Sequence, residues 1–563
     1  MKKLLLGCVV FGATCVALGG TVWAQSSGPV TDEVLRSPDA SDWLAWRGTQ
    51  QSQGYSPLDQ INRETVGDLR LAWAWAIEDG NSQPAPVVRD GVMYLTGPGG
   101  IVQALDGATG DLIWEYRHRG ADLGTAVSAI RTTRGLGLYD DKVYLAAPDA
   151  RLVALDASTG TVVWDTQVAD PADGFGFGAA PVVARGVVVS GLMGCRKFIE
   201  EKCAITGHDA QTGVRLWRVP TVPGANDPAG DTWGDLDPIY RAGTEMWISG
   251  SYDHERNLVF WATAQAKPWA RASRGTDGAA LYSNTTLALR PTTGEVVWYQ
   301  QTIPGETHDL DEVYESILVD RGERQSLFKM GKIGILWELD RDNGDIVGAT
   351  DLGYQNLVDL DPETGAVAYR PGVIPTLNEP VDQCPGNLGF RNWPAMAYHP
   401  ETEAFYIPLL MACASFRYVP VEFVPGGGGL GYGGDQPYFH PDADEQLGRL
   451  LAISTSGDVL WERSQRAMFS SATLTTAGGL VFAADVDRYI RAYDVSNGDE
   501  LWQTRVQAGG QGFPMTYAAG GRQFVAVPVG VGAILPGGRY MALTPELKRP
   551  NAGNGLMVFA LPE

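Results

Sequence analysis

Basic side chains and histidines are scarce in this chain of 563 residues. Lys and Arg number 43 against 66 Asp and Glu, so the formal net charge is −23. Phosphate groups would be repelled, which argues against nucleic acids and anionic membranes as partners. The acidic surplus would suit a small basic partner or serve only solubility. With six His, no C-x-x-C and no C-x-x-C-H, the sequence disfavours a zinc site and excludes covalently attached c-type haem.

Long apolar runs are also missing, apart from one at the start. Residues 1–24 combine two lysines, an apolar stretch and a small-residue end at Ala24, which is the pattern of a secretory signal peptide. No other segment approaches the length needed to span a membrane. The sequence therefore predicts an exported, periplasmic protein with no transmembrane segment.

Removing this leader leaves four cysteines in an oxidising compartment. We expect disulfides between Cys195 and Cys203 and between Cys384 and Cys413, because each pair closes a local loop. A zinc site is the competing interpretation.

What the chain does contain is a repeated phrase, a short apolar run followed by Asp-x-x-x-Gly-x-x-x-Trp or a close variant. The copies span residues 104–114, 154–164, 207–217, 288–298, 452–461 and 492–502, with a degraded copy lacking Trp at 338–348. Each copy reads as a strand, a tight turn that needs the conformational freedom of Gly, and a second strand ending in Trp.

Repeats of short strands at this period indicate a β-propeller, in which a closed ring of sheets buries what a single hairpin cannot. The alternative is a β-sandwich with similar hairpins. The repeat runs almost from end to end, so we predict an all-β chain with a single domain at 25–563. The strand-like stretches at 41–50 and 68–76 could share one sheet with the C-terminal stretch 554–563 and so close the ring.

The repeat loosens between residues 218 and 440, where polar motifs appear in irregular segments. The densest is ETHDLDEVYE at 306–315, in which Asp309 and Asp311 point to the same side of an extended chain. Converging carboxylates need a multivalent cation or a shared proton. A solvated acidic loop is the plainer interpretation. A hydrolase or lyase using His308 and Asp309 is a third one, but no G-x-S-x-G nucleophile accompanies the pair.

Three further polar residues stand in apolar surroundings: Gln265 in ATAQAKPW, Lys332 in GKIGILWELDR and Asn392 in RNWPAMAYHP. A buried Lys is rarely unpaired, so Lys332 could also form no more than a salt bridge to a structural Asp.

With these motifs the sequence resembles the PQQ-dependent (quinoprotein) alcohol dehydrogenase family, of the haem-free type, over essentially the whole mature chain. The resemblance implies an eight-bladed propeller with Trp-docking turns, and PQQ beside one metal ion, calcium or a lanthanide. HDLDEV is similar to the family's catalytic stretch, which implies Asp309 as the base. Asp311 falls where lanthanide-using members carry Asp.

The same resemblance assigns the rest of the site. GTEMWISGSYD implies Trp247 as the residue stacked on the quinone, and GKIGILWELDR implies Lys332 beside the quinone oxygens. ATAQAKPW implies Gln265 as a metal ligand with Asp309 and Asp311. Asn392 and Arg134 match polar positions around the cofactor, and Gln83 stands where a cofactor-contacting Glu is common. The placement of Cys384 and Cys413 resembles a family disulfide.

Departures from the family pattern concern the cofactor lid and the metal. Ser128 and Ala129 stand where many relatives have adjacent cysteines. Met193 stands nearest the position of a metal-binding Glu, so either Glu200 or Glu201 replaces it or the metal site is weakened.

The expected activity is oxidation of an alcohol to an aldehyde or ketone, with hydride transfer to PQQ and electrons passed to a soluble cytochrome c or similar acceptor. A non-catalytic cell-envelope propeller that acts as a scaffold is the alternative.

Overall fold

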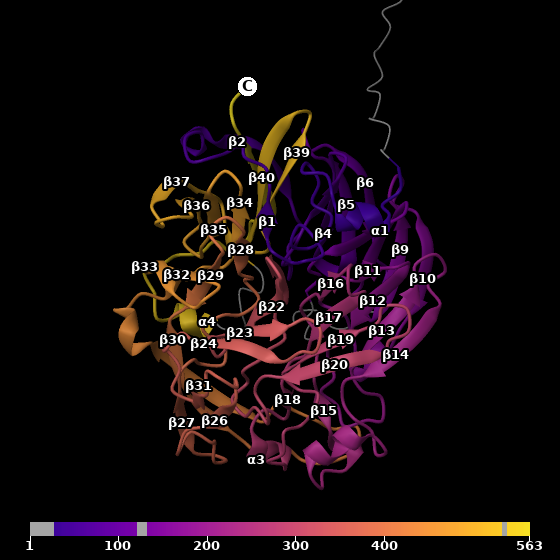
Figure 1. Ribbon diagram of the computed structural model, residues 1–563, viewed down its shortest axis with the longest axis vertical. Coiled ribbons are helices and arrows are strands. Elements are labelled where there is room, and N and C mark those ends of the chain that lie inside the picture. The colour runs from indigo at the N-terminus through magenta and orange to yellow at the C-terminus, as the bar shows by residue number, and fades with distance from the viewer. Residues whose placement is uncertain (1–27, 121–131, 532–537) are drawn as a thin grey trace, which may run out of the picture.

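The computed structural model describes residues 28–120, 132–531 and 538–563. The predicted leader at 1–24 and positions 128 and 129 lie outside these ranges. Within them, six sheets have four strands and two have five, arranged side by side around a central axis (Figure 1). The prediction of an all-β chain is confirmed.

The eight larger sheets follow one another along the chain. They are β3–β6 (Val87–Arg89, Val92–Gly97, Ile101–Asp106, Leu112–Arg117), β7–β10 (Leu136–Tyr139, Lys142–Ala146, Arg151–Asp156, Val162–Gln167), β11–β14 (Val182–Ala184, Val187–Gly191, Ala204–Asp209, Arg215–Pro220), β16, β17, β19 and β20 (Ser251–Asp253, Leu258–Ala262, Thr285–Leu289, Val296–Gln301), β21–β24 (Ile317–Arg321, Arg324–Met330, Ile335–Asp340, Ile346–Asp351), β28, β29, β32 and β33 (Ala397–His399, Ala404–Leu410, Gly448–Ser454, Val459–Gln465), β1 with β34–β37 (Tyr55–Ser56, Leu474–Thr476, Leu480–Ala484, Tyr489–Asp494, Glu500–Arg505), and β2 with β38–β41 (Arg70–Ala76, Gly509–Gly510, Met515–Ala519, Arg522–Gly530, Gly555–Ala560).

Neighbouring sheets are joined through the Trp of the repeat. The indole Nε1 of Trp114, on β6, donates to the carbonyl oxygen of Ala157 in the turn of the next sheet at 2.9 Å. Gly160 in that turn has a φ of +70°, and a Cβ there would lie 2.4 Å from the Trp114 ring. The same donor–acceptor contact recurs in the pairs Trp164–Ala210, Trp217–Pro291, Trp298–Arg341 and Trp461–Val495. Gly is therefore needed in this turn for two reasons. It adopts the positive φ, and its lack of a side chain leaves room for the indole ring of the neighbouring sheet.

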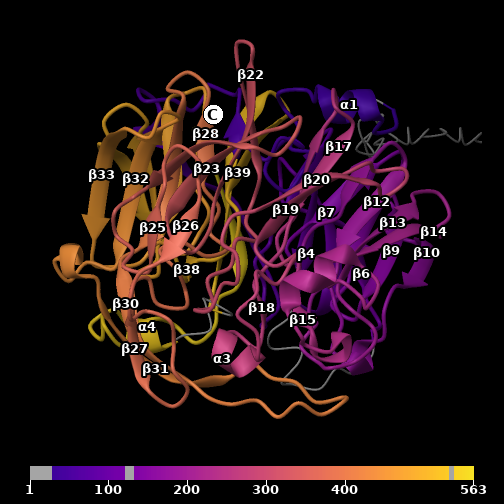
Figure 2. The ribbon, with the colours of Figure 1, turned by 60° about the horizontal axis from the view of Figure 1, so that its bottom comes forward.

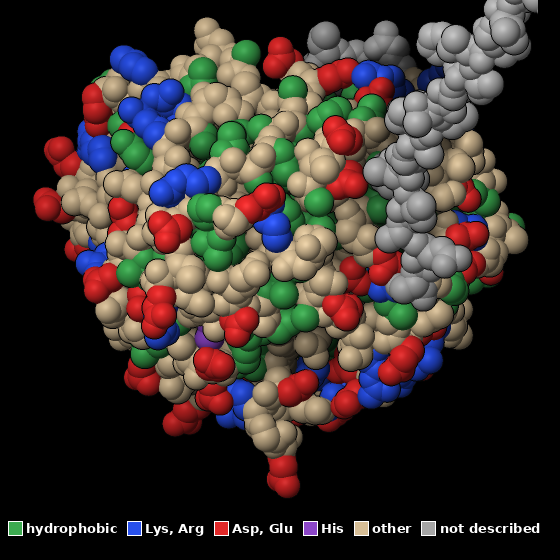
Figure 3. Space-filling model, turned by 90° about the horizontal axis from the view of Figure 1, so that it is seen from above, with side chains coloured by type: hydrophobic (Ala, Val, Ile, Leu, Met, Phe, Trp, Pro, Cys, Tyr) green, Lys and Arg blue, Asp and Glu red, His purple; other side chains and the backbone are tan. Residues whose placement is uncertain are grey.

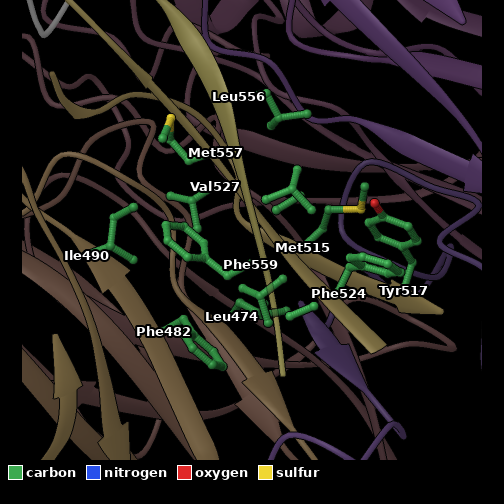
Figure 4. Packing of buried hydrophobic residues seen from close by; sticks show 14 of the residues in the cluster. Leu474, Phe482, Ile490, Met515, Tyr517, Phe524, Val527, Leu556, Met557 and Phe559 are labelled. Carbon is green, nitrogen blue, oxygen red and sulfur yellow. The ribbon is translucent and has the colours of Figure 1, made fainter. Parts of the chain in front are cut away.

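The stretch 68–76 shares a sheet with the C-terminal stretch 554–563, as predicted, whereas in 41–50 Trp43 bridges to Val88 of another sheet. Strand β2 pairs antiparallel with β41, with Trp73 opposite Val558. In Figure 1 the indigo strand β2 lies near the yellow strand β40, and β41 pairs with both of them. Apolar side chains of β39–β41, including Met515, Phe524 and Phe559, pack with Leu474 and Phe482 of the preceding sheet (Figure 4).

The region between residues 218 and 440, where the repeat loosens, contributes strands to the larger sheets and also forms three smaller ones. These are β15 with β18 (Ala242–Gly243, Ala266–Lys267), β25 with β26 (Val358–Leu360, Val367–Tyr369), and β27, β30 and β31 (Pro380–Gln383, Ala412–Tyr418, Tyr432–Phe439). Helix α3 (Arg271–Arg274), strands β15, β18, β27 and β31, and helix α4 (Gly538–Met541) gather at the lower end in Figure 2. Helix α1 (Asp32–Arg36) lies near the other end.

Both predicted disulfides are present, Cys195–Cys203 and Cys384–Cys413. Within the described ranges, one group of side chains has the spacing of a metal site, namely Cys384, Cys413 and His440. Their sulfurs are bonded to each other and are not thiolates, so the zinc interpretation is wrong. No helix in the described part of the chain is long and apolar enough to cross a bilayer.

The contact between Trp and the Gly turn predicts that replacement by Ala destabilises the protein to different extents at two glycines. These are Gly213 and Gly186, which have the same φ of +73°. A Cβ at Gly213 would lie 2.6 Å from the Trp164 ring, whereas a Cβ at Gly186 meets no atom within 4 Å. We expect Gly186→Ala to lower the free energy of unfolding by about 1–2 kcal/mol through backbone strain. Gly213→Ala should cost about 1–3 kcal/mol more through overpacking.

Urea denaturation of both variants beside the parent protein measures this difference. Equal losses of stability in the two variants would contradict the role given to the contact between the Trp164 ring and Gly213.

Candidate active site

One cavity of about 470 Å³ collects the eight side chains that the family resemblance assigned to the cofactor and the metal. Its lining includes Gln83, Arg134, Trp247, Gln265, Asp309, Asp311, Lys332 and Asn392. These residues come from segments spread over more than 300 positions. Their convergence follows from the ring, which turns loops of different sheets toward one place.

The acidic segment 306–315 is a buried loop between β20 and β21. All five of its acidic residues are at most 6% exposed: Glu306, Asp309, Asp311, Glu312 and Glu315. The interpretation as a solvated acidic loop is therefore wrong. Buried carboxylates require partners, and the loop finds them on the neighbouring strands.

Lys332 is the partner of the two carboxylates in the cavity. It follows β22, and its Nζ lies 2.7 Å from Asp311 Oδ2 and 3.4 Å from Asp309 Oδ1. The same Nζ donates to the carbonyl oxygen of Asp309 at 2.7 Å. Asp309 itself has a φ of +63°, a conformation uncommon for a residue with a side chain. The contact to its carbonyl holds the backbone in this state.

These contacts set the proton affinity of Asp309. Burial raises the pKa of the Asp309 carboxyl well above its usual value, and the nearby Asp311 raises it further, while Lys332 and Lys267 oppose the rise. Burial alone would lower the pKa of Lys332, but the two aspartates bring it above its ordinary value. The result is a buried carboxyl with high proton affinity beside an ammonium whose pKa is also raised, which suits a general base.

Gln265 supplies the donor that fits a metal ion. Its Nε2 donates to Asp309 Oδ1, and its backbone N–H donates to Asp311 Oδ1 at 3.3 Å. Its amide oxygen Oε1 is buried and has no hydrogen-bond partner among the described residues. Carboxylate and amide oxygens are the ligands of calcium and similar hard cations. This orphaned acceptor beside two carboxylates fits such an ion.

Trp247 and Arg134 form a surface that fits a flat, anionic cofactor. The Arg134 guanidinium lies over the Trp247 ring at 5.3 Å and donates to the Trp247 carbonyl at 2.7 Å. Burial lowers the pKa of Arg134 to about 9. In the described chain no carboxylate pairs with Arg134, and its Nε has no hydrogen-bond partner. A buried cation without a counter-ion suits a ligand carboxylate such as those of PQQ.

The remaining predicted contacts lie on loops of the cavity wall. Asn392 uses its amide within its own loop, donating to Leu388 O at 3.0 Å and accepting from Trp393 N at 2.9 Å. Gln83 lies on the segment that follows β2. Asn554, just before β41, donates to the carbonyls of Glu78 and Gly80 at 3.0 Å, so the closing sheet holds that segment.

Sequence reasoning missed an ion pair in the same wall, between Glu245 and Lys267. The small sheet of β15 and β18 brings their two segments together. Burial would raise the pKa of Glu245, yet Lys267, Arg196 and hydrogen bonds bring it to about 2. Glu245 stands two positions before Trp247 and Lys267 two after Gln265. Residues two positions apart on an extended chain point to the same side, so this spacing could have indicated that Glu245 and Lys267 lie near the site.

Three alternatives from the sequence find no place in this cavity. Glu201 pairs with Arg218 on the surface, and neither Glu200 nor Glu201 lines the cavity, whereas Met193 does. His308 is fully buried outside the lining, with Nδ1 at 3.1 Å from Gln383 Oε1. Burial lowers its pKa to about 4. A neutral His308 directed at Gln383 does not form a catalytic dyad with Asp309.

The fold and this cavity define a quinoprotein dehydrogenase, and sequence comparison agrees. Residues 43–351 and 451–525 match the PQQ family, described as the glucose/ethanol/alcohol dehydrogenase β-propeller domain. The chain belongs to this family and is a PQQ-dependent alcohol dehydrogenase. The alternative of a non-catalytic scaffold is therefore wrong.

Named relatives cover nearly the whole chain. It is 32% identical to the quinohemoprotein alcohol dehydrogenase ADH IIB of Pseudomonas putida, over 96% of this chain and 81% of that protein. It is 32% identical to the quinoprotein alcohol dehydrogenase PedH of Pseudomonas putida, over 98% and 96% respectively. A solved europium-containing methanol dehydrogenase superposes with a TM-score of 0.86 at 25% identity, covering 94% of this chain and 100% of that one.

The buried loop predicts a pH-dependent stability. Burial raises the pKa of Glu306 from 4.5 to about 7, although backbone N–H groups of His308 and Leu310 oppose the shift. A folded-state pKa above the unfolded value means that ionisation opposes folding. Stability is therefore lost as the pH rises from about 4.5 to about 7.

Glu306→Gln should remove this loss. We expect the variant to gain melting temperature relative to the parent at pH 8 but little at pH 5, measured by calorimetry in metal-free buffer. Glu363→Gln, at an exposed position, is the control and should behave alike at both pH values. An equal shift for Glu306→Gln at both pH values would contradict the prediction.

Proposed function

We propose that the protein is a periplasmic alcohol dehydrogenase that binds PQQ and one metal ion, calcium or a lanthanide. It oxidises an alcohol to an aldehyde or ketone and passes the electrons to a soluble cytochrome c or similar acceptor. The observation that carries the proposal is the buried Asp309, held by Lys332 next to Asp311, in a cavity that also contains Trp247 and Arg134.

The domain organisation completes the proposal. Residues 1–24 would be the cleaved leader and 25–563 a single domain. The six four-stranded and two five-stranded sheets would each be one blade of an eight-bladed propeller. In support, the sheet formed by β2 and β38–β41 uses both ends of the chain, as a closed ring requires.

Cofactor binding would use the residues already described. Trp247 offers a flat apolar face, with Tyr314 set edge-on behind it at 5.2 Å, so its orientation is fixed. Arg134 would pair with a cofactor carboxylate, and Gln83 and Asn392 would contact polar atoms of its rim. Bound PQQ supplies the hydride acceptor, and a bound metal ion supplies Lewis acidity.

The metal ion would be held by Asp309, Asp311 and Gln265. A second carboxylate favours a higher cation charge, because attraction scales with the product of charges. The europium in the name of one structural relative is an ion of this kind. Asp311 is therefore the residue that bears on the choice between calcium and a lanthanide.

The proton step belongs to Asp309. Its carboxylate would accept the proton of the alcohol hydroxyl, and its raised pKa makes it a stronger base than an exposed Asp. Lys332 holds the carboxylate in place and stabilises negative charge that develops beside it. The apolar faces of Trp247 and Trp269 limit the access of water to the reacting atoms.

The electrons must leave on another protein, since the chain has no C-x-x-C-H for its own haem. A net charge of −23 suits a basic cytochrome. Figure 3 shows acidic side chains spread over one face among fewer basic ones. The attraction would therefore act over a broad surface.

Replacing Asp309 tests the activity directly. The mature protein would be mixed with PQQ and calcium or a light lanthanide, and dye reduction followed on a panel of primary and secondary alcohols. Asp309→Asn should lower kcat by about 10²–10⁴-fold, because the base is lost. Asp59→Asn, at an exposed position, should retain the parent rate. Failure to bind PQQ with either ion would overturn the proposed site.

Replacing Asp311 tests the ion. Asp311→Ala removes one carboxylate, so affinity should fall more for a trivalent than for a divalent cation. We expect the metal concentration for half-maximal activity to rise at least about tenfold more for the lanthanide than for calcium. Equal rises for the two ions would contradict a role for Asp311 in selecting the ion.

A further inference from the structure

The cavity contains a buried ion pair that the proposed reaction does not use. Glu245 and Lys267 form it, and each side chain is 4% exposed. Glu245 Oε1 also accepts the backbone N–H of Gly194 at 2.8 Å and lies 3.5 Å from Arg196 Nε. This carboxylate is thus held by two cations and one amide, in the wall of the cavity that contains Asp309 and Asp311.

The backbone places this pair next to the proposed metal donors. The N–H of Thr244 donates to the carbonyl of Gln265 at 3.1 Å, and the N–H of Ala264 donates to the carbonyl of Glu245 at 2.9 Å. Lys267 follows Gln265 by two residues, and its charge acts on Asp309. The ion pair and the metal donors therefore share one pair of extended segments and one buried space.

In this arrangement the Glu245 carboxylate is bound to Lys267. Within the described ranges, Glu245, Asp309 and Asp311 do not have carboxylate oxygens that all lie within 4.8 Å of one another. Asp309 and Asp311 thus share one ammonium group, Lys332, whereas Glu245 is paired with both Lys267 and Arg196. A multivalent cation would supply the positive charge that is missing beside Asp309 and Asp311, and the third carboxylate is already occupied by Lys267.

We infer that Lys267 is an internal counter-ion that competes with the metal ion for the Glu245 carboxylate and thereby weakens metal binding. The inference rests on the metal site of the proposed function. An ammonium within the same buried space repels a divalent or trivalent ion and also occupies an oxygen donor that the ion could use. Lys267 therefore sets the metal concentration at which the site fills.

The test measures metal binding without turnover. Terbium is added to the metal-free mature protein, and its luminescence is excited through Trp247 and Trp269, which line the cavity. Calcium is then added as a competitor. Lys267→Met keeps the length of the side chain and removes its charge, so the Kd for terbium should fall at least about tenfold.

Two matched variants separate the charge from the shape. Lys267→Arg keeps the charge, and its Kd should stay near that of the parent. The double variant Lys267→Met/Glu245→Gln removes one charge of each sign, and its Kd should return toward the parent value. Thermal melting of each variant, compared with the parent, confirms that it is folded.

The inference is overturned if Lys267→Met binds terbium no more tightly than the parent, or if the double variant keeps the whole gain. Failure of the proposed function has a different signature, because then no variant, including the parent, binds terbium in the cavity. Parent binding without a gain in Lys267→Met overturns the inference alone.

Discussion

The contact between the Trp of one sheet and the Gly turn of the next is the constraint on which the structure depends. Trp114 can be seated only if Gly160 lacks a side chain, and its indole N–H is satisfied only by the carbonyl of Ala157. The sheets that carry this Trp are not complete alone, because each of them needs the turn of its neighbour. Such contacts impose a ring, and a ring brings its inner loops together around one axis. The cavity is thus a consequence of the docking geometry.

Inside that cavity, the charged side chains interact strongly because little water screens them. Lys332 lies 3.4 Å from Asp309 and 2.7 Å from Asp311 and offsets the repulsion between these two carboxylates, and burial raises the pKa of Asp309. Burial also leaves the amide oxygen of Gln265 without a hydrogen-bond partner in the part of the chain that the structure describes. The polar groups of this site are arranged for a ligand more than for each other, which is typical of a preorganised catalytic centre.

Local signals carried most of what could be predicted. The Asp–Gly turns, the indole positions and the two disulfides depend on short stretches of chain, and the Asp309–Asp311 spacing is visible within one motif. The burial of the 306–315 loop was not predictable, because an irregular segment has no periodicity that separates inside from outside. Glu245 and Lys267 were missed for another reason. Their pairing depends on the register between β15 and β18. A long connection separates these two strands, so no short hairpin turn sets that register.

Closure by β2 and β41 also has a consequence in time. The segment carrying Gln83 is held in the cavity wall by Asn554, which follows the 306–315 loop by more than 200 residues. During synthesis the chain therefore contains the 306–315 loop well before the residue that fixes the segment carrying Gln83. A chain that lacked Asn554 and β41 would leave this segment without two of its hydrogen bonds, so its cavity wall would be incomplete.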